Sequence, residues 1–198
     1  MLHELKHPNI GKLLGLCVKS EKPSPSIHLR GVTSVQELGR PVECNWLKKL
    51  PWIKRFKICQ SIASLLEYLA NSPLGSLQIV DFKYQQFVMI DNVIKLIDLD
   101  DVSSVEPECN DMPCVIEGKQ NMAGIVCRDF HCQGMNTARN LIQAYKLFFN
   151  PLLPGDVPAK LHSLVSRLLA DIENMNINTR ELVKSLQLVE KQWFLLKN

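Results

Sequence analysis

Apolar residues recur at steps of three and four over residues 52–70, and this spacing predicts an amphipathic helix with one buried face. The sequence Ser-Pro-Leu-Gly at 72–75 predicts the end of that helix, because Pro and Gly interrupt helical structure. The positions that define the buried face are Trp52, Phe56, Cys59, Ile62, Ala63, Leu66 and Leu69.

Three further helices are predicted toward the C-terminus. One begins near Asn136 and is expected to end at Pro151 and Pro154, because Pro lacks the N–H group that a helix interior needs. Residues 161–172 and 180–196 repeat the helical spacing of apolar residues and complete the chain.

Short apolar stretches bounded by turn residues predict strands in the first half of the chain. The expected strands cover residues 10–18, 27–36, 77–80, 87–90 and 93–97. The Asp-Asn pair between the last two predicts a tight hairpin turn. A few strands followed by segregated helices predict an α+β domain and not a doubly wound sheet.

Composition agrees with one globular domain. The chain has 198 residues, of which 46% are hydrophobic and 22% charged. No apolar stretch is long enough to span a bilayer as a helix, and residues 1–7 lack the apolar core of a secretory signal peptide. We therefore expect no membrane span and no signal peptide in this chain.

The net charge of +3 is too small and too scattered to predict a nucleic-acid partner. The basic residues come close together in one place only, where they alternate with apolar residues, so we interpret them as the solvated face of a helix. They are Lys48, Lys49, Lys54, Arg55 and Lys57.

Four of the seven cysteines fall within one polar stretch that has no helix or strand period. Two Cys-x4-Cys pairs are a poor match to the Cys-x2-Cys turn of most zinc sites. The spacing leaves open two disulfides, which form in oxidising compartments, or four reduced thiols. The four residues are Cys109, Cys114, Cys127 and Cys132.

Two carboxylates follow predicted strands and are candidates for shared chemistry. Asp81 lies after the strand at 77–80, and Asp98 lies at the exit of the strand at 93–97. Such a pair can divide the work, one residue holding a divalent metal and the other accepting a proton from a hydroxyl. The alternative is that Asp81 caps a turn and that residues 98–101 form a solvated acidic loop.

The order of these segments resembles that of protein kinases. Residues 5–10 (LKHPNI), followed by 13–15 (LLG), resemble the end of the kinase αC helix and the start of strand 4. Residues 80–87 (VDFKYQQF) resemble the catalytic loop, and 95–100 (KLIDLD) resemble the strand that leads into the metal-binding DFG triplet. The resemblance covers essentially the whole chain.

Within the protein kinases, the sequence is most similar to the secreted vertebrate lonesome kinase (PKDCC) group. That group contains protein-tyrosine kinases of the secretory pathway (Golgi) or extracellular space, which act on proteins found there. The matching segments are 35–42 (VQELGRPV), 72–75 (SPLG), 98–101 (DLDD), 132–136 (CQGMN), 148–149 (FF) and 152–154 (LLP).

The resemblance assigns roles to single residues. Asp81 matches the catalytic Asp that takes the proton of the acceptor hydroxyl, and Lys83 matches the residue that contacts the transferred phosphate. Asp98 matches the ligand of Mg²⁺ (or Mn²⁺), and Gln86 stands where most kinases have a metal-binding Asn.

The resemblance also implies a division of the chain and an ATP site. Residues 1–40 match the last part of an N-lobe, with the end of αC, strands 4 and 5 and the hinge. Residues 41–198 match a mostly helical C-lobe whose activation segment, rich in Cys, spans 101–135. In the hinge, Glu37, Leu38 and Gly39 are expected to bind ATP. Within that activation segment, the four clustered cysteines are expected to form loop disulfides.

Several departures from the family pattern bear on activity. Ile79 and Val80 replace the His-Arg that usually precedes the catalytic Asp, and Asp100 replaces the Gly of DFG. The chain contains no Gly-rich loop, no strand-3 Lys and no αC Glu; Glu4 lies too close to His7 to be that Glu. We therefore expect a partial kinase domain, inactive alone, or alternatively a pseudokinase fragment that serves as a protein-interaction module.

Overall fold

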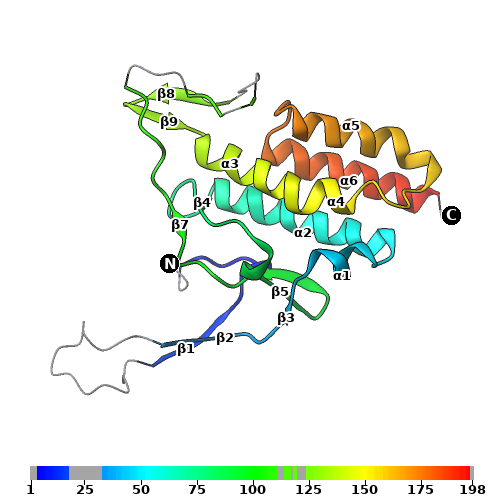
Figure 1. Ribbon diagram of the computed structural model, residues 1–198, viewed down its shortest axis with the longest axis horizontal. Helices are drawn as coiled ribbons and strands as arrows, with labels where there is room; N and C mark the ends of the chain where they lie inside the picture. The colour runs from blue at the N-terminus through cyan, green and yellow to red at the C-terminus, as the bar shows by residue number, and fades with distance from the viewer. Residues whose placement is uncertain (1–3, 18–32, 111–113, 117, 120–123, 197–198) are drawn as a thin grey trace.

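The computed structural model describes residues 4–17, 33–110, 114–116, 118–119 and 124–196, and these form a helical layer beside several small sheets (Figure 1). This mixture of helices and small sheets is compatible with the predicted α+β class. The helical layer consists of α1 (Cys44–Lys48), α2 (Trp52–Ala70), α3 (Met135–Ala144), the π-helical turn η3 (Tyr145–Phe149), α4 (Asn150–Leu152), α5 (His162–Glu173) and α6 (Thr179–Leu195), with 3-10 turns η2 (Tyr84–Gln86) and η4 (Ala159–Leu161).

The strands are short, and all of their pairings are antiparallel. One sheet has the order β3-β5-β6, and three two-stranded sheets pair β1 with β2, β4 with β7 and β8 with β9. The strands are β1 (Leu13–Cys17), β2 (Thr33–Gln36), β3 (Arg40–Pro41), β4 (Gln78–Ile79), β5 (Phe87–Ile90), β6 (Val93–Leu96), β7 (Val102–Ser103), β8 (Val126–Arg128) and β9 (His131–Gln133).

Helix α2 is the centre of the core, as its apolar periodicity predicts. All seven positions of the predicted face are buried, and the helix packs against α3, α4, α6 and β6. Its first turn is fixed by Trp52, whose indole Nε1 donates to the Leu153 carbonyl at 3.0 Å. The helix ends at Ala70, and Ser72 then closes a tight turn with Gly75.

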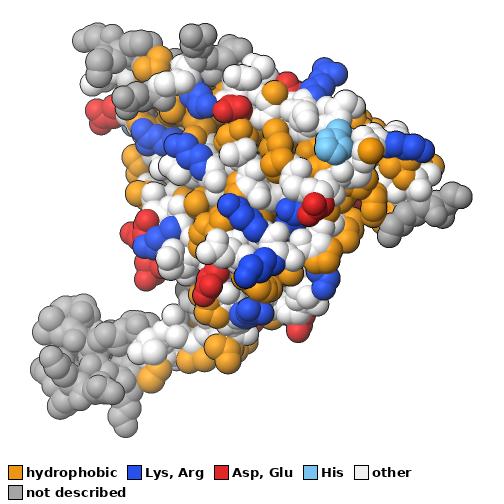
Figure 2. Space-filling view, turned by 45° about the vertical axis from the view of Figure 1, so that its right-hand side comes forward, with side chains coloured by type: hydrophobic (Ala, Val, Ile, Leu, Met, Phe, Trp, Pro, Cys, Tyr) orange, Lys and Arg blue, Asp and Glu red, His pale blue; other side chains and the backbone are white. Residues whose placement is uncertain are grey.

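The interpretation of Arg55 as part of a solvated basic face is wrong. Its side chain is buried, donates a hydrogen bond to the Gly155 carbonyl and lies 3.6 Å from the Asp156 carboxylate. A buried guanidinium needs such partners, and here they come from a loop about a hundred residues away. The four lysines of the group are exposed, and Figure 2 shows charges of both signs interspersed on one face of the molecule.

The helix that begins at Met135 ends at Leu152, between Pro151 and Pro154, as predicted, with Pro151 inside its last turn. Pro151 has no N–H to offer the carbonyl of Leu147, four residues earlier. The Tyr84 hydroxyl donates to that Leu147 carbonyl, so the missing helical bond is replaced by one from another segment. The π-helical turn and α4 therefore carry the helical backbone on to Leu152.

The hairpin β5–β6 agrees closely with its prediction. Asp91 and Asn92 both adopt left-handed φ angles, as a two-residue hairpin turn requires. By contrast, the stretch predicted to lack regular structure contains β7, β8 and β9. Each of these strands has only two or three residues, so no alternation of polar and apolar residues can be read from them.

Three other expectations need correction. The opening segment has no helix within its described part, which contains turns and an isolated bridge between Ile10 and Leu96. Helix α1 and strand β3 were not predicted from the sequence. The strands expected at 10–18 and 27–36 are observed as β1 and β2; residues 18 and 27–32 lie outside the described part. No helix within the described residues is long and apolar enough to cross a membrane.

Candidate active site

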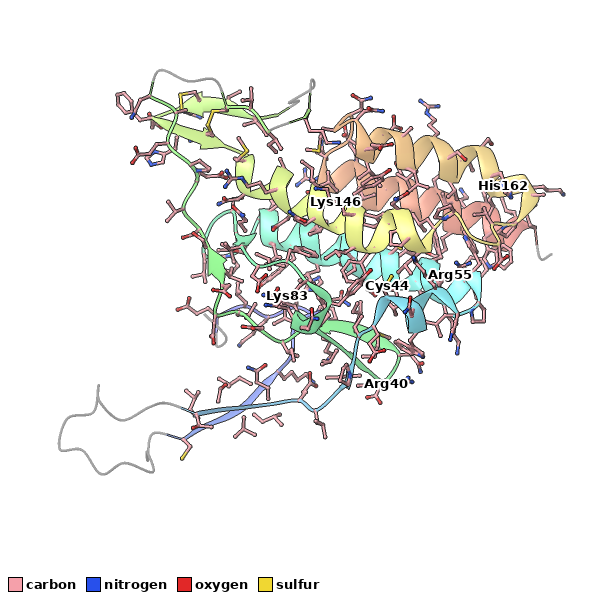
Figure 3. All side chains as sticks on the ribbon, in the orientation of Figure 1. Arg40, Cys44, Arg55, Lys83, Lys146 and His162 are labelled. Carbon is pink, nitrogen blue, oxygen red and sulfur yellow. A yellow bond between two sulfur atoms is a disulfide. The ribbon has the colours of Figure 1, made fainter. Side chains whose placement is uncertain are left out.

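The loop after β4 presents two charged side chains as a pair. Asp81 and Lys83 form an ion pair in which the ammonium donates to carboxylate oxygen Oδ2. Both remain accessible, with 45% of the Asp81 side chain and 49% of the Lys83 side chain exposed. Figure 3 shows Lys83 above the β5–β6 sheet. A carboxylate and an ammonium are therefore available to a molecule that approaches this loop.

Strand β7 fixes one side of the loop. The Val80 amide donates to the Asp101 carbonyl at 2.8 Å, and Ile79 pairs with Val102. Because Asp101 lies only three residues after Asp98, this pairing draws the segment that carries Asp98 toward Asp81. The structure thus links the two loops that carry the predicted carboxylates.

Helix α3 fixes the other side through a residue that the sequence analysis missed. The Asn140 amide oxygen accepts from the Ile79 N–H at 2.9 Å, and its amide nitrogen donates to the Leu77 carbonyl at 2.8 Å. Asn140 is buried, so both bonds are shielded from water. A polar residue within an apolar helix face, here among Ala138, Leu141 and Ile142, is the signal that could have found it.

Aromatic packing holds the middle of the loop. The buried ring of Phe82 lies 5.5 Å from Phe87 and 6.3 Å from Phe148 between ring centroids. Burial raises the pKa of the Tyr84 hydroxyl, so this group stays protonated as the donor to Leu147. With Phe82 facing the core, the neighbouring side chains of Asp81 and Lys83 turn to the surface.

Gln86 and Asp98 are brought together by the β5–β6 hairpin. The Ile97 N–H donates to the Gln86 carbonyl at 2.9 Å, which extends the ladder by one step, so that Asp98 directly follows the residue paired with Gln86. The Gln86 side chain is 1% exposed, yet its amide oxygen has no hydrogen-bond partner in the described structure. Asp98 is exposed, and its Oδ1 accepts from the Asp100 N–H at 3.1 Å. An unpartnered buried amide oxygen beside a carboxylate is a donor set suited to a hard divalent cation.

Electrostatics connect these groups. The hydrogen bond that Lys83 donates to Asp81 is the main cause that raises the pKa of Lys83, and the nearby charges of Asp81, Asp101 and Asp98 raise it further. Lys83 therefore stays protonated through the physiological range and faces three carboxylates. The site has an excess of negative charge that a bound cation would offset.

Glu37 lies in the segment that joins β2 to β3 and is tied to β6. It accepts a hydrogen bond from the Lys95 ammonium at 2.6 Å and one from the Lys12 backbone N–H at 3.0 Å. The bond from Lys95 is the largest of the causes that lower the pKa of Glu37. Since Lys95 lies three residues before Asp98, this ion pair connects the predicted hinge to the strand that leads to Asp98.

The other two predicted hinge residues behave differently from each other. Gly39 packs directly on β5, and a Cβ atom added there would lie 2.6 Å from the Val88 Cβ. Only a residue without a side chain fits that approach. Leu38 is 94% exposed, so its side chain is not part of the described core.

Two disulfides link the segment between β7 and α3, in agreement with the disulfide interpretation of the four clustered cysteines. They join Cys109 to Cys127 and Cys114 to Cys132. Glu106 in the same segment accepts from the N–H groups of Gly134 and Asn136, at the start of α3. These hydrogen bonds attach the disulfide-linked segment to α3, the helix that carries Asn140. This helix-capping role of Glu106 was not predicted from the sequence.

Comparison with known proteins identifies a protein kinase that is similar to this chain. No family model matches the chain. The chain is 38% identical over 171 residues to the extracellular tyrosine-protein kinase PKDCC of Homo sapiens, and the match covers 85% of this chain and 34% of that protein. The chain is therefore a relative of a protein kinase and spans about a third of the length of the curated relative it matches.

Proposed function

From this relationship and the geometry of the site, we propose that the chain is part of a kinase domain that transfers the γ-phosphoryl group of ATP to a protein hydroxyl, that of tyrosine. In this proposal residues 1–40 are the remnant of the N-lobe, and residues 41–198 are the C-lobe with its activation segment at 101–135. The relative is named an extracellular kinase, and the two disulfides fit a secretory location. Protein substrates would then be proteins of that compartment.

Asp81 is the proposed catalytic base. Its loop is held by β7 on one side and by Asn140 on the other, so the carboxylate is fixed before an acceptor binds. A carboxylate oxygen would accept the proton of the acceptor hydroxyl as that oxygen bonds to phosphorus. Lys83, already paired with Asp81, would offset negative charge on the transferred group.

Asp98 and Gln86 are the proposed residues for Mg²⁺ or Mn²⁺. Their oxygens fit such a cation because one is a charged carboxylate and the other a buried amide oxygen with no partner among the described groups. Bound there, the cation would neutralise the phosphate charges of ATP. Glu37, Leu38 and Gly39 would border the nucleotide base, and the ion pair between Glu37 and Lys95 would hold that segment to β6.

One observation supports the proposal: the carboxylates of Asp81 and Asp98 both act on Lys83 and raise its pKa. Backbone hydrogen bonds from Val80 to Asp101 and from Ile97 to Gln86 link the segments that carry these residues. If residues 98–101 formed only a solvated acidic loop, the buried amide oxygen of Gln86 would have no reason to lack a hydrogen-bond partner.

A pseudokinase that serves as an interaction module is the second candidate. It is favoured by departures from the family pattern within the catalytic segments, where Ile79 and Val80 replace the usual His-Arg and Asp100 replaces the Gly of DFG. Residues 1–198 include no Gly-rich loop, strand-3 Lys or αC Glu to hold ATP phosphates, and each preorganised group of this kind contributes about 10²-fold to 10³-fold in rate. Residues 1–198 alone are therefore expected to give no measurable transfer from radiolabelled ATP to a tyrosine-rich acceptor.

Metal binding and transfer are tested separately. Mn²⁺ binding to residues 1–198, measured by electron paramagnetic resonance, should weaken at least about tenfold in Asp98→Asn. Asp171→Asn, a carboxylate change on α5, is the matched control and should bind as the parent does. Unchanged Mn²⁺ binding in Asp98→Asn would contradict the metal site.

Phosphoryl transfer from ATP is measured in a longer form of the protein that carries the remaining N-lobe strands. In that longer form, Asp81→Asn should abolish phosphoryl transfer and leave Mn²⁺ binding intact. A longer form that binds Mn²⁺ and ATP but transfers nothing would favour the pseudokinase.

A further inference from the structure

The two disulfides of the segment between β7 and α3 lie side by side, next to the β8–β9 hairpin (Figure 3). The sulfur atoms of Cys109, Cys114 and Cys127 lie within 4.8 Å of one another, and Cys114 is bonded to Cys132. A thiolate released from one disulfide would therefore be within reach of the other disulfide. The kinase proposal uses these four sulfurs only as a mark of the secretory pathway.

Each disulfide joins a buried cysteine to a more accessible one. Cys109 and Cys132 are 2% and 4% exposed. Their partners differ: Cys127 is exposed and Cys114 is half-buried. Thiol–disulfide exchange begins when a thiolate attacks a sulfur atom that it can reach, and the other sulfur then leaves as a thiolate. Cys127 is therefore the expected point of attack, and Cys109 is the sulfur that leaves.

The register of the β8–β9 hairpin offers the cysteines a second pairing. Cys127 and Cys132 are directly opposite each other in this antiparallel ladder. Opposite residues of such a ladder have their Cα atoms about 4.5–5.5 Å apart, a separation that a disulfide can span. Cys109 and Cys114 already have neighbouring sulfur atoms. Each of the four cysteines therefore has an alternative partner close by.

We propose that this cluster is a thiol–disulfide exchange site, which a small thiol or the dithiol of an oxidoreductase opens at Cys127. The incoming thiolate bonds to Cys127 and releases the Cys109 thiolate. Cys109 then bonds to Cys114 and releases Cys132. The Cys132 thiolate bonds to Cys127 and releases the incoming thiol unchanged. The products are the disulfides Cys109–Cys114 and Cys127–Cys132, so the exchange involves no net oxidation or reduction.

The exchange would release a connection to α3. In the described connectivity both disulfides join the segment after β7 to the β8–β9 hairpin, whereas in the second connectivity each disulfide lies within one of them. Glu106 belongs to the segment after β7 and accepts from the N–H groups of Gly134 and Asn136, at the start of α3. After exchange, only non-covalent contacts such as the backbone hydrogen bonds to β9 would keep Glu106 in place. The second connectivity therefore weakens the cap of α3.

Peptide mapping after exposure to reduced glutathione tests the exchange. Accessible thiols of residues 1–198 are first blocked with N-ethylmaleimide, and samples are quenched with acid. Trypsin cleaves after Lys119 and Arg128, which leaves the first two clustered cysteines on one peptide and the last two on separate peptides. The described connectivity joins all three peptides, and the exchanged one joins only the last two. We expect this two-peptide product, with captured glutathione at least about tenfold more abundant on the Cys127 peptide than on the Cys132 peptide.

Hydrogen exchange followed by mass spectrometry tests the consequence for α3. Amides in residues 133–139 should exchange at least about fivefold faster in the exchanged form, because their cap is weakened. Glu106→Ala should give the same increase without glutathione, since it removes the carboxylate that accepts from α3. Glu108→Ala removes an exposed carboxylate two positions later and is the matched control, which should leave these amides unchanged. Both readouts are independent of phosphoryl transfer, so the inference does not rest on the kinase proposal.

Four outcomes would overturn the proposal. The first is a map in which the three peptides stay joined at every glutathione concentration that leaves the disulfides oxidised. The second is equal capture of glutathione at Cys127 and Cys132. The third is an exchanged form whose α3 amides exchange as slowly as those of the described form. The fourth is the pairing of Cys109 with Cys132 and of Cys114 with Cys127, which a further cleavage at Asp111 distinguishes from the described connectivity.

Discussion

Replacing Gly39 with Ala tests the close approach between the predicted hinge and β5. The new Cβ would lie 2.6 Å from the Val88 Cβ, 2.7 Å from its Cγ2 and 2.8 Å from the Ile90 Cγ1. Val88 is buried and its strand is paired on both sides, by β3 and by β6, so the neighbouring atoms have little room to move. Overpacking of this kind costs about 1–3 kcal/mol of the free energy of unfolding.

Gly15→Ala is the matched control. Gly15 lies in β1, and a Cβ there would meet nothing within 4 Å. Both substitutions reduce the freedom of the unfolded chain to the same extent, so the difference between them reports the contact with Val88. We expect Gly15→Ala to stay within about 0.5 kcal/mol of the parent.

Scanning calorimetry and urea unfolding measure the effect. For a chain of this size about 1 kcal/mol corresponds to about 2–4 °C, so Gly39→Ala should lower the Tm by about 2–12 °C. A Tm equal to that of Gly15→Ala would refute the close packing of the hinge on β5. Since Gly39 precedes β3, the same substitution should shift the β3 pairing with β5 and so disturb the proposed ATP site.

Three other predictions concern support for the site. Asn140→Ala should destabilise the fold by about 2–4 kcal/mol in urea unfolding, because it leaves two buried backbone groups without partners; a loss below about 1 kcal/mol would contradict that clamp. The lowered pKa of Glu37 means that its pairing with Lys95 stabilises the fold above the pKa of the unfolded carboxyl and that this is lost as pH falls through the folded value. Glu37→Gln should therefore reduce the acid dependence of the Tm below about pH 5, and an unaltered profile would refute the pairing. Alkylation in denaturant without reductant, followed by intact-mass analysis of secreted protein, should label Cys17, Cys44 and Cys59 and leave the other four cysteines unlabelled; labelling of all seven would exclude the disulfides.

The elements that could be predicted are those whose pattern of apolar or turn residues lies within one continuous segment of the sequence. Helix α2 repeats its apolar face over 19 residues, so burial of that face follows from periodicity alone. The β5–β6 hairpin was predictable because Asp91 and Asn92 both tolerate left-handed φ angles. Once this hairpin is in register, Gln86 pairs with Ile97, and Asp98 follows one residue later.

The rest depends on partners distant in sequence. Arg55 is buried because Gly155 and Asp156 fold back onto it, and nothing in its own segment indicates this. Strands β7, β8 and β9 exist through pairing and cross-linking and not through any periodicity of their own. The pairing of Glu37 with Lys95 is likewise tertiary, and a scan of local sequence cannot detect it.

The two disulfides are interleaved along the chain, and this order has a consequence for making the protein. Each native bond joins cysteines 18 positions apart, whereas Cys109 and Cys114, like Cys127 and Cys132, are only five positions apart. Closing the shorter loop costs less chain entropy by about 1 kcal/mol, so neighbouring cysteines should pair about sixfold more often in an unfolded chain. Oxidation by air alone should therefore yield mostly scrambled isomers. A thiol–disulfide exchange catalyst, as in the endoplasmic reticulum, would be needed to convert them to the native connectivity.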